Sequence, residues 1–378
     1  MKIMLTAGEA SGDVHGAGLA REIKKLSPAT ELFGLGGNLM AAQGVRLVRN
    51  YADYNVMGVV EVIKNLRRIL RLLDDLTEII RVERPDLLVL IDYPDFNWRL
   101  AKRAKRLGVK ILSYIPPSAW AWRKGRAKSC AAVADVFIAI FPFELPVYEA
   151  AGAKIFFLGN PLVDTVKPTM SVAQARKFFG VAEGDSVVLL MPGSRRQEIK
   201  LLLPPMLGAA KILSANRRVK FFLPVADGVD RSNLQRQITA ANVPITLTDS
   251  ARRYDLMQIA HAAMATSGTV VLEAALLNLP CVVCYKMAPL NFFIGNLLVD
   301  IKFFSLPNIL AGAEILTELL QDAVTSEKIS AEVSKLLDAD NRSRVVEKLR
   351  AACSRLGTSG AAARVAKKIL QTANDCGC

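Results

Sequence analysis

The chain has 378 residues, of which 52% are hydrophobic; this fits two folded domains and excludes a disordered protein. With 49 basic and 35 acidic residues its formal net charge is +14, so we expect an anionic partner. Two histidines, His15 and His261, leave little from which to build a zinc site or a histidine-based triad. No apolar run reaches the roughly 20 residues of a membrane span, and no secretory signal is expected, so the sequence predicts a cytoplasmic protein.

Short apolar runs alternate with helix-length patterns, which predicts parallel sheets with crossover helices. In the first half we expect strands at residues 2–6, 31–34, 87–92, 110–114, 135–140 and 154–158. In the second half we expect them at residues 186–191, 219–225, 244–247, 262–265 and 280–285. The predicted fold is α/β, with two Rossmann-like, doubly wound parallel-sheet domains facing a cleft. We assign residues 1–165 to the first domain, 166–345 to the second, and 346–378 to a helical segment that packs back on an N-terminal domain, of its own chain or of a neighbour.

The expected strands of the first half are followed by loops rich in glycine, proline or aromatic residues. These loops include Gly8-Glu9-Ala10-Ser11-Gly12-Asp13, Asp92-Tyr93-Pro94-Asp95-Phe96-Asn97 and Phe141-Pro142-Phe143-Glu144. Ligands of such sheets bind beyond the carboxyl ends of the strands, so we predict a site among these loops. The first loop is not the GxGxxG fingerprint of dinucleotide-binding proteins, and we do not expect NAD.

Residues 59–84 form a helical pattern whose apolar face covers roughly 200° of the wheel. Lys64, Arg67, Arg68 and Arg71 fill much of the remainder. A wide apolar face beside a basic strip is typical of a helix that lies in the membrane interface, and an anionic membrane surface is the predicted partner. A helix buried on two sides is the alternative. The predicted membrane-contact residues are Val59, Val62, Ile63, Leu66, Ile69, Leu70 and Leu73. We expect no nucleic-acid partner, because no known nucleic-acid-binding module is present.

Two glycine-centred loops in the second half each follow an apolar run and open into a helical pattern. They are Met191-Pro192-Gly193-Ser194-Arg195-Arg196 and Ala265-Thr266-Ser267-Gly268-Thr269. A strand that turns through small residues into a helix leaves free N–H groups at the positive end of the helix dipole, which binds phosphate without a metal. Glu273 lies one helical turn after Thr269, where a carboxylate can accept the hydroxyls of a ribose. The loops therefore predict a nucleoside diphosphate site.

These motifs, together with Met57-Gly58-Val59-Val60-Glu61-Val62 and Trp120-Ala121-Trp122, closely resemble those of the lipid-A-disaccharide synthases in order and spacing. The resemblance extends from residue 1 to about residue 350. It implies an inverting, metal-independent glycosyltransferase without a cofactor, peripheral on the inner face of the cytoplasmic membrane. The implied donor is UDP-2,3-diacylglucosamine and the implied acceptor is 2,3-diacylglucosamine 1-phosphate. The implied products are the β-1′,6-linked disaccharide 1-phosphate and UDP.

The chemistry of this transfer needs a base for the acceptor hydroxyl and a counter-charge for the departing diphosphate. We predict Asp92 as the base, because it ends a strand and would be desolvated by Tyr93 and Phe96. We predict Arg195 as the diphosphate counter-charge. The predicted nucleotide-binding residues are Gly193, Ser194, Arg195, Ser267, Gly268, Thr269 and Glu273, to which the resemblance adds Asn308. The predicted acceptor-binding residues are Glu9, Ser11, Gly12, Asp13, His15 and Asp95, among which Asp95 and Glu9 are alternative bases and Asp13 and His15 weaker ones.

Two other functions remain open from the sequence. One is another nucleotide-sugar enzyme of this architecture, such as a UDP-N-acetylglucosamine 2-epimerase. The other is a non-catalytic lipid-binding protein, which would bind acyl lipid but not UDP. Acyl-chain preference and oligomeric state, including a homodimer, are not encoded in any pattern that we identify.

Overall fold

The computed structural model spans residues 1–378 and describes all of them except 55–58, 120–124, 288–301 and 376–378. The side chains of residues 59–66 and of residue 216 also lie outside the description. The chain divides into two compact units: unit 1 consists of Met1–Pro161 and Leu356–Cys378, and unit 2 of Leu162–Arg355. The chain passes from unit 1 to unit 2 after Pro161 and returns to unit 1 after Arg355. The sequence analysis expected these domain boundaries after residues 165 and 345.

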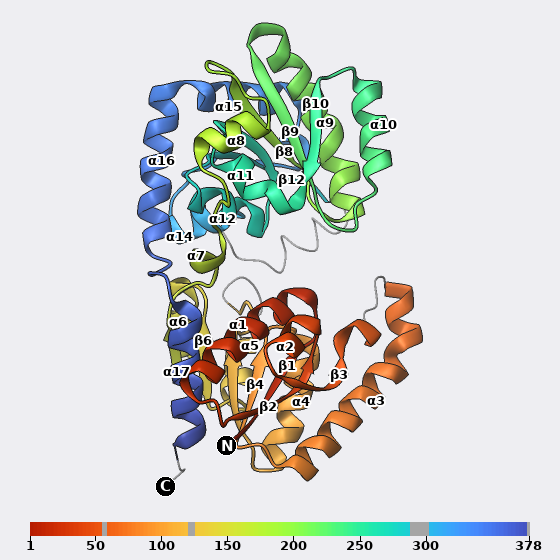
Figure 1. Ribbon diagram of the computed structural model, residues 1–378, viewed down its shortest axis with the longest axis vertical. Helices are drawn as coiled ribbons and strands as arrows, with labels where there is room; N and C mark the ends of the chain where they lie inside the picture. The colour runs from red at the N-terminus through yellow and green to blue at the C-terminus, as the bar shows by residue number, and fades with distance from the viewer. Residues whose placement is uncertain (55–58, 120–124, 288–301, 376–378) are drawn as a thin grey trace. The chain divides into compact units, whose positions relative to one another are not determined.

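Unit 1 contains a seven-stranded sheet in the order β3-β2-β1-β4-β5-β6-β7, and all its strand pairs are parallel (Figure 1). The central strand β4 has the sequence Leu-Leu-Val-Leu-Ile and is buried at every position, as expected for a strand covered on both faces. The strands are β1 (Lys2–Ala7), β2 (Glu31–Gly36), β3 (Arg46–Asn50), β4 (Leu87–Ile91), β5 (Lys110–Tyr114), β6 (Val136–Ala139) and β7 (Ile155–Phe157).

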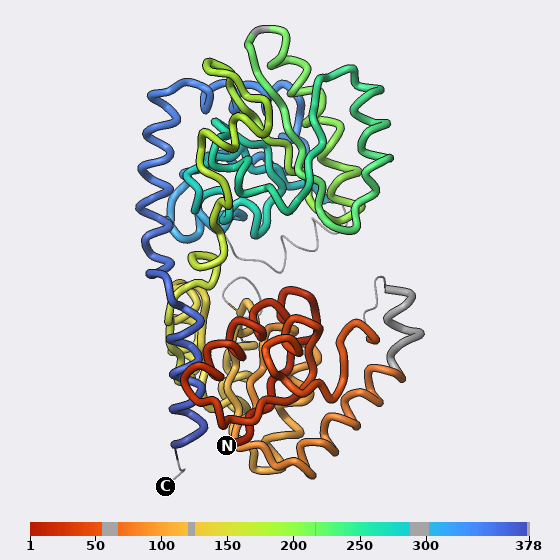
Figure 2. The backbone as a smooth tube through the Cα atoms, viewed as in Figure 1, coloured from red at the N-terminus to blue at the C-terminus, as the bar shows by residue number. Residues whose placement is uncertain are grey.

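Helices cover both faces of this sheet, so unit 1 is doubly wound. One face packs against α1 and α17, which lie side by side although they come from opposite ends of the chain (Figure 2). The other face packs against α3, α4, α5 and α6. The helices of unit 1 are α1 (Ala10–Leu26), α2 (Asn38–Ala42), α3 (Val59–Glu83), α4 (Pro94–Arg106), α5 (Gly125–Ala131), α6 (Leu145–Glu149) and α17 (Ala361–Asn374), with 3-10 turns at Tyr51–Tyr54 and Pro142–Glu144.

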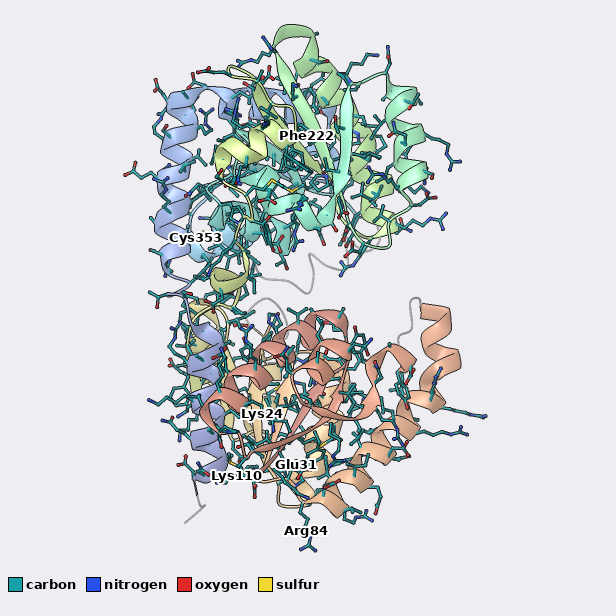
Figure 3. All side chains as sticks on the ribbon, in the orientation of Figure 1. Lys24, Glu31, Arg84, Lys110, Phe222 and Cys353 are labelled. Carbon is teal, nitrogen blue, oxygen red and sulfur yellow. The ribbon has the colours of Figure 1, made fainter. Side chains whose placement is uncertain are left out.

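Unit 2 contains a six-stranded parallel sheet in the order β10-β9-β8-β11-β12-β13. Its strands are β8 (Ser186–Met191), β9 (Val219–Val225), β10 (Ile245–Asp249), β11 (Ala262–Thr266), β12 (Cys281–Tyr285) and β13 (Glu318–Leu320). Helices α9, α10 and α15 pack on one face, and α8, α11, α12 and α16 pack on the other, around the buried Phe222 labelled in Figure 3.

The helices of unit 2 are α7 (Leu162–Thr165), α8 (Val172–Phe178), α9 (Arg196–Asn216), α10 (Arg231–Ala241), α11 (Arg253–Met257), α12 (Thr269–Leu276), α14 (Leu306–Ala311), α15 (Ser326–Leu337) and α16 (Ala339–Ser354), with 3-10 turns at Ser250–Arg252 and Gln321–Ala323.

The expected strands all occur, with shifts of a few residues at their ends, and the two doubly wound sheets confirm the predicted fold class. Two strands, β3 and β13, were not predicted. The β3 sequence Arg-Leu-Val-Arg-Asn is polar because the strand lies at a sheet edge, and β13 has three residues. The strand expected at 87–92 ends instead at Ile91, because Asp92 adopts a left-handed backbone conformation with φ 48°.

In both sheets the carboxyl ends of the strands lie at one edge, and the loops singled out from the sequence leave from that edge. Figure 3 marks the opposite edge of the unit 1 sheet with Glu31 and Lys110, the first residues of β2 and β5. Unit 1 and unit 2 therefore each present one loop-bearing edge at which a ligand site can form.

Candidate functional site

A cavity of about 500 Å³ lies at the carboxyl edge of the unit 2 sheet. The loops after β8, β9, β10 and β11 and the first turns of α9, α11 and α12 surround it. Its lining residues are Met191, Pro192, Gly193, Ser194, Arg195, Glu198, Pro224, Ala226, Asp227, Ser250, Arg253, Met257, Thr266, Ser267, Gly268, Thr269, Val270 and Glu273. The cavity thus brings together both glycine loops that the sequence predicted as phosphate sites, and its size is that of a small-molecule pocket.

The first glycine loop turns from β8 into α9 through Gly193, whose φ of 108° is strained for any residue with a side chain. A Cβ at this position would lie 2.2 Å from Glu198 Oε2, so the close approach also requires glycine. The Arg195 backbone N–H donates to Glu198 Oε2 at 3.3 Å, and its guanidinium pairs with Glu198 Oε1 at 3.1 Å. The Arg195 side chain remains 85% exposed and can exchange this carboxylate for a bound phosphate.

The second glycine loop places Gly268 at the N-cap of α12, which begins at Thr269. No side chain caps this helix start, and its first residues Thr269 and Val270 line the cavity, so the positive end of the helix dipole lies at the cavity wall. Ser267 has a different role from the one expected. Its hydroxyl donates to the Phe304 carbonyl at 2.8 Å and its N–H to the Cys284 carbonyl at 3.3 Å, so both donors anchor the loop.

Glu273 forms a hydrogen-bonded cluster with two residues that sequence reasoning missed. The Tyr254 hydroxyl donates to Glu273 Oε1 at 2.9 Å, and Arg253 Nε donates to Oε2 at 3.4 Å. Arg253 also donates to the Tyr254 hydroxyl at 2.8 Å. Burial and the neighbouring Glu273 carboxylate raise the pKa of Tyr254 to about 12, which keeps the hydroxyl protonated as a donor. The cluster fixes the Glu273 carboxylate at the cavity wall, with lone pairs left for ligand hydroxyls.

Asp227 and Ser250 form the part of the cavity wall that follows β9 and β10. The Ser250 hydroxyl donates to Asp227 Oδ1 at 2.8 Å. Both residues were missed because neither belongs to the two glycine-centred loops singled out from the sequence. The signal that could have found them is their position two and three residues beyond the strands predicted at 219–225 and 244–247.

The structure corrects the prediction for Asn308, which is fully buried. Its amide nitrogen donates to the Leu316 carbonyl and to Glu318 Oε1, each at 2.8 Å. Its amide oxygen accepts from the N–H groups of Ile315 and Leu316, each at 2.9 Å. The side chain therefore holds together the segment before β13 and is not available to a nucleotide.

At the carboxyl edge of unit 1, Asp92 and Tyr93 form a strained turn between β4 and α4. Both have left-handed backbones, with φ 48° and 50°. Asn97 is buried and stabilises this turn, because its Nδ2 donates to the Asp92 carbonyl at 2.7 Å and lies 3.3 Å from the Thr6 carbonyl. The Asp92 N–H donates to the Tyr114 carbonyl at 3.0 Å. Strained, over-determined backbone of this kind is typical of functional sites.

The loop after β1 packs against this turn and brings a second carboxylate to Asp92. A Cβ on Gly8 would lie 2.1 Å from the Tyr93 ring, so glycine is needed for the contact. Burial first, and then the negative charge of Glu9, raise the pKa of Asp92 to about 6. Glu9 also accepts from the Ser11 hydroxyl at 2.9 Å. The predicted residues Glu9, Ser11 and Asp92 are thus brought together.

Glu144, at the end of the Phe141–Glu144 motif, is a third carboxylate of this edge and was not assigned a role from the sequence. It is buried, and its Oε2 accepts from the N–H groups of Ile140 and Phe141 at 3.2 and 3.1 Å. Burial raises the pKa of Glu144 to about 7, and the charge of Asp92 adds to the shift. Its carboxylate shapes the loop that follows β6.

The structure corrects the acceptor-binding prediction for Asp13. Its buried carboxylate accepts from the N–H groups of Gly37, Leu39 and Met40 at 2.9, 3.1 and 3.0 Å. Asp13 therefore caps the start of α2 and has a structural role. Gly12 is also buried, and a Cβ there would approach Ala7 to 3.1 Å, so it allows α1 to pack on β1.

His15 and Asp95 lie in opposite environments. Burial lowers the pKa of His15 to about 4, and its ring packs edge-on against Tyr114. A neutral imidazole supplies no charge for a phosphate at neutral pH. Asp95 is 94% exposed and pairs with Arg126 at 2.9 Å. As an exposed, ion-paired carboxylate, Asp95 fits the role of a base less well than Asp92 does.

Helix α3 is less exposed than its sequence pattern suggested. Leu72, Leu73, Leu76 and Ile80 are buried in the core of unit 1, so the prediction of Leu73 as a membrane-contact residue was wrong. Ile69 is half-buried against the same core, whereas Leu70 is 38% exposed. The side chains of Val59, Val62, Ile63 and Leu66 lie outside the described residues, as does the Trp120-Ala121-Trp122 motif.

Among the residues that the structure describes, no helix is long and apolar enough to cross a membrane.

Comparison with known proteins assigns the chain to a family. The family model described as lipid-A-disaccharide synthetase matches residues 3–371. The lipid-A-disaccharide synthase of Geobacter sulfurreducens is 42% identical over 375 residues, which cover 98% of this chain and 97% of the relative.

Solved structures with this fold are more distant in sequence. The UDP-GlcNAc 2-epimerase of Neisseria meningitidis bound to UDP-GlcNAc has a TM-score of 0.66 at 13% identity, covering 98% of this chain and 100% of the other. The calicheamicin glycosyltransferase CalG4 has a TM-score of 0.64 at 16% identity, covering 100% of this chain and 99% of the other. The fold is thus that of the two-Rossmann (GT-B) glycosyltransferases. By its sequence the chain belongs to the lipid-A-disaccharide synthase family.

Proposed function

We propose that the chain condenses UDP-2,3-diacylglucosamine with 2,3-diacylglucosamine 1-phosphate to give the β-1′,6-linked lipid A disaccharide 1-phosphate and UDP. Family membership supports the reaction class. The cavity of unit 2, with two glycine loops that turn into helices and a carboxylate held by Arg253 and Tyr254, is the observation that carries the donor assignment.

In this proposal unit 2 binds the UDP part of the donor. The first N–H groups of α12, with Thr269 at its start, donate to the diphosphate. The Glu273 carboxylate accepts the ribose hydroxyls, because Arg253 and Tyr254 hold it in a fixed orientation. The remaining wall, with Asp227 and Ser250, receives the uracil.

Asp92 acts as the general base in unit 1. The acceptor 6-hydroxyl transfers its proton to Asp92 as its oxygen forms a bond to the anomeric carbon of the donor. The bond from that carbon to the β-phosphate oxygen breaks, and its electron pair leaves with UDP. Arg195 and the α12 amides stabilise the negative charge that develops on the diphosphate. A pKa of about 6 leaves Asp92 mostly deprotonated at neutral pH while keeping it basic enough to accept a proton.

Both substrates carry acyl chains, so the enzyme has to reach them at the membrane. We assign the contact to α3, where Leu70 is exposed beside the exposed Arg67, Arg68 and Arg71. The arginines would attract anionic lipid and Leu70 would enter the interface. Replacing Leu70 by serine should reduce co-sedimentation with anionic vesicles, whereas Val82→Ser, also exposed on α3, should not. Equal sedimentation of both variants with the wild type would remove Leu70 from the contact.

The reaction is tested by incubating the purified protein with both diacylated substrates and measuring UDP release together with formation of the disaccharide. Release of UDP that requires the acceptor is the expected result. Conversion of UDP-N-acetylglucosamine without an acceptor would indicate an epimerase instead. Binding of acyl lipid with no affinity for UDP would indicate a lipid-binding protein.

A further inference from the structure

A second cavity of about 500 Å³ lies beside the nucleotide cavity in unit 2 and has no role so far. The two cavities share three lining residues, Arg195, Glu198 and Ser267. The rest of the lining comes from α9, from the end of β12 and from the chain after it, namely Gln197, Leu201, Tyr285, Lys286, Met287 and Phe304. The two cavities therefore adjoin along a wall that includes Arg195.

Outside the shared boundary, this second cavity is lined by four apolar or aromatic side chains and by two polar ones. Tyr285 and Phe304 stack with their ring centroids 5.6 Å apart and an interplanar angle of 27°. Leu201 and Met287 complete this side, and all four side chains are half-buried. The shared boundary is polar, with Arg195 and Glu198 paired at 3.1 Å, and Gln197 and Lys286 are the polar residues in the rest of the lining. The cavity thus adds an apolar and aromatic wall to the polar boundary that it shares with the first cavity.

Hydrogen bonds to the backbone of Met287 and Phe304 hold these walls in place. Gln321 accepts from the Met287 N–H at 3.0 Å and donates to the Met287 carbonyl at 3.3 Å. Glu318 accepts from the Phe304 N–H at 2.8 Å, and the Ser267 hydroxyl donates to the Phe304 carbonyl at 2.8 Å. The last bond ties the aromatic wall directly to the second glycine loop.

The order of strands gives the direction in which a bound ligand would run. The sheet order is β10-β9-β8-β11-β12, and Asp227 and Ser250, to which the uracil is assigned, follow β9 and β10. The diphosphate would then lie between the loops after β8 and β11. Whatever is attached to the β-phosphate continues past Arg195 toward β12, which is where the second cavity opens.

We propose that the second cavity binds the acylated glucosamine of the donor, with its acyl methylenes against Tyr285, Met287 and Phe304. This inference rests on the proposed function, because it takes a UDP-linked diacyl sugar as the donor. In this inference, these residues distinguish an acylated sugar nucleotide from one without acyl chains. Glu198 and Arg195, at the polar end, would face the sugar hydroxyls and the scissile bond.

The experiment measures binding to unit 2 in the full-length protein with two kinds of probe. UDP alone reports the first cavity, and a series of UDP-glucosamines with short acyl chains of increasing length, all kept monomeric, reports the second. In the wild type the dissociation constant should fall as methylenes are added. Phe304→Ala should weaken binding of the longest of these probes by about tenfold or more, while UDP affinity changes by less than about twofold. Phe178→Ala, an exposed phenylalanine of the same unit, serves as the matched control.

Met287→Ala provides a second test in case Phe304→Ala fails to fold, and normal UDP affinity is the criterion of folding for both variants. A chain-length dependence that is unchanged in folded Phe304→Ala or Met287→Ala would overturn the inference alone. A wild-type protein that binds no UDP would overturn the proposed function, and this inference with it.

Discussion

The two sheets have the same topology class but different chemistry at their carboxyl edges. In unit 2 the edge combines donors, namely the α12 amides, Arg195, Arg253 and Tyr254, with carboxylates that already accept hydrogen bonds, namely Glu198, Asp227 and Glu273. In unit 1 the edge gathers carboxylates, and burial raises the pKa of both Asp92 and Glu144. One edge is suited to bind an anion and the other to accept a proton. The comparison shows that loop residues, rather than the shared sheet, set what each unit can do.

The largest effect is expected at the base. Asp92→Asn should lower turnover by about 10²- to 10⁴-fold, because the acceptor hydroxyl loses its proton acceptor, while UDP affinity stays unchanged. In the wild type, kcat/KM should fall as the pH drops below about 6, where Asp92 becomes protonated. Steady-state kinetics and UDP titration measure both quantities. Asp74→Asn, an exposed carboxylate of unit 1, is the control.

A different result would assign the role of the base to a neighbouring carboxylate. If Asp92→Asn retains wild-type turnover and Asp95→Asn or Glu9→Gln loses it, the base is one of these neighbours.

The carboxylate edge should also affect stability. Because burial raises the pKa of Glu144 from its ordinary value to about 7, the folded state binds more protons than the unfolded state between pH 4.5 and about 7, and stability falls as the pH rises through this window. Glu144→Gln removes this loss while keeping an acceptor for the two N–H groups. It should stabilise the protein by up to about 3 kcal/mol at pH 8 and by nothing below pH 4.5.

Chemical denaturation of the Glu144→Gln variant at the two pH values measures this difference, with the exposed Glu149→Gln as control. A variant that is less stable than the wild type at pH 8 would show that the hydrogen bonds outweigh the burial of charge.

The sequence was sufficient to predict most of the fold, because a strand buried on both faces is a continuous apolar run, as in Leu87–Ile91. It was insufficient for β3 and β13, since an edge strand and a three-residue strand leave no such run. The α3 pattern was ambiguous for a physical reason: a wide apolar face fits both a core and a membrane, and Leu73 belongs to the core.

The candidate site was predictable where backbone shape dictates the residue, as at Gly193. It was not predictable where a polar side chain finds its partners only through the tertiary fold. Asp13 and Asn308 looked like ligand contacts, but each is occupied by backbone groups of a neighbouring segment. Arg253 and Tyr254 were missed because α11 has five residues and no recognisable period.

In unit 2, substitution of Glu273 tests the proposed contact between its carboxylate and the ribose. Glu273→Ala should weaken UDP binding by about 10- to 100-fold, because a charged hydrogen-bond acceptor contributes about 1.5–3 kcal/mol. The same variant should bind UDP and 2′-deoxy-UDP with more similar affinities than the wild type does. Calorimetric titration of both ligands measures this, with Glu347→Gln on α16 as an exposed control. An undiminished preference for UDP in the variant would place the ribose away from Glu273.

The smallest effect is expected from Asn97, which acts on the carboxylate edge through the backbone. Asn97→Ala removes the donor that holds the Asp92 carbonyl, so the left-handed turn can relax and move the base. We expect a loss of about 1–3 kcal/mol in the free energy of unfolding and a fall in turnover well below that of Asp92→Asn, with unchanged UDP affinity. Denaturation and kinetics measure this against Asn233→Ala, an exposed control in unit 2. If stability falls but kcat and its pH profile are those of the wild type, Asn97 supports the fold without positioning the base.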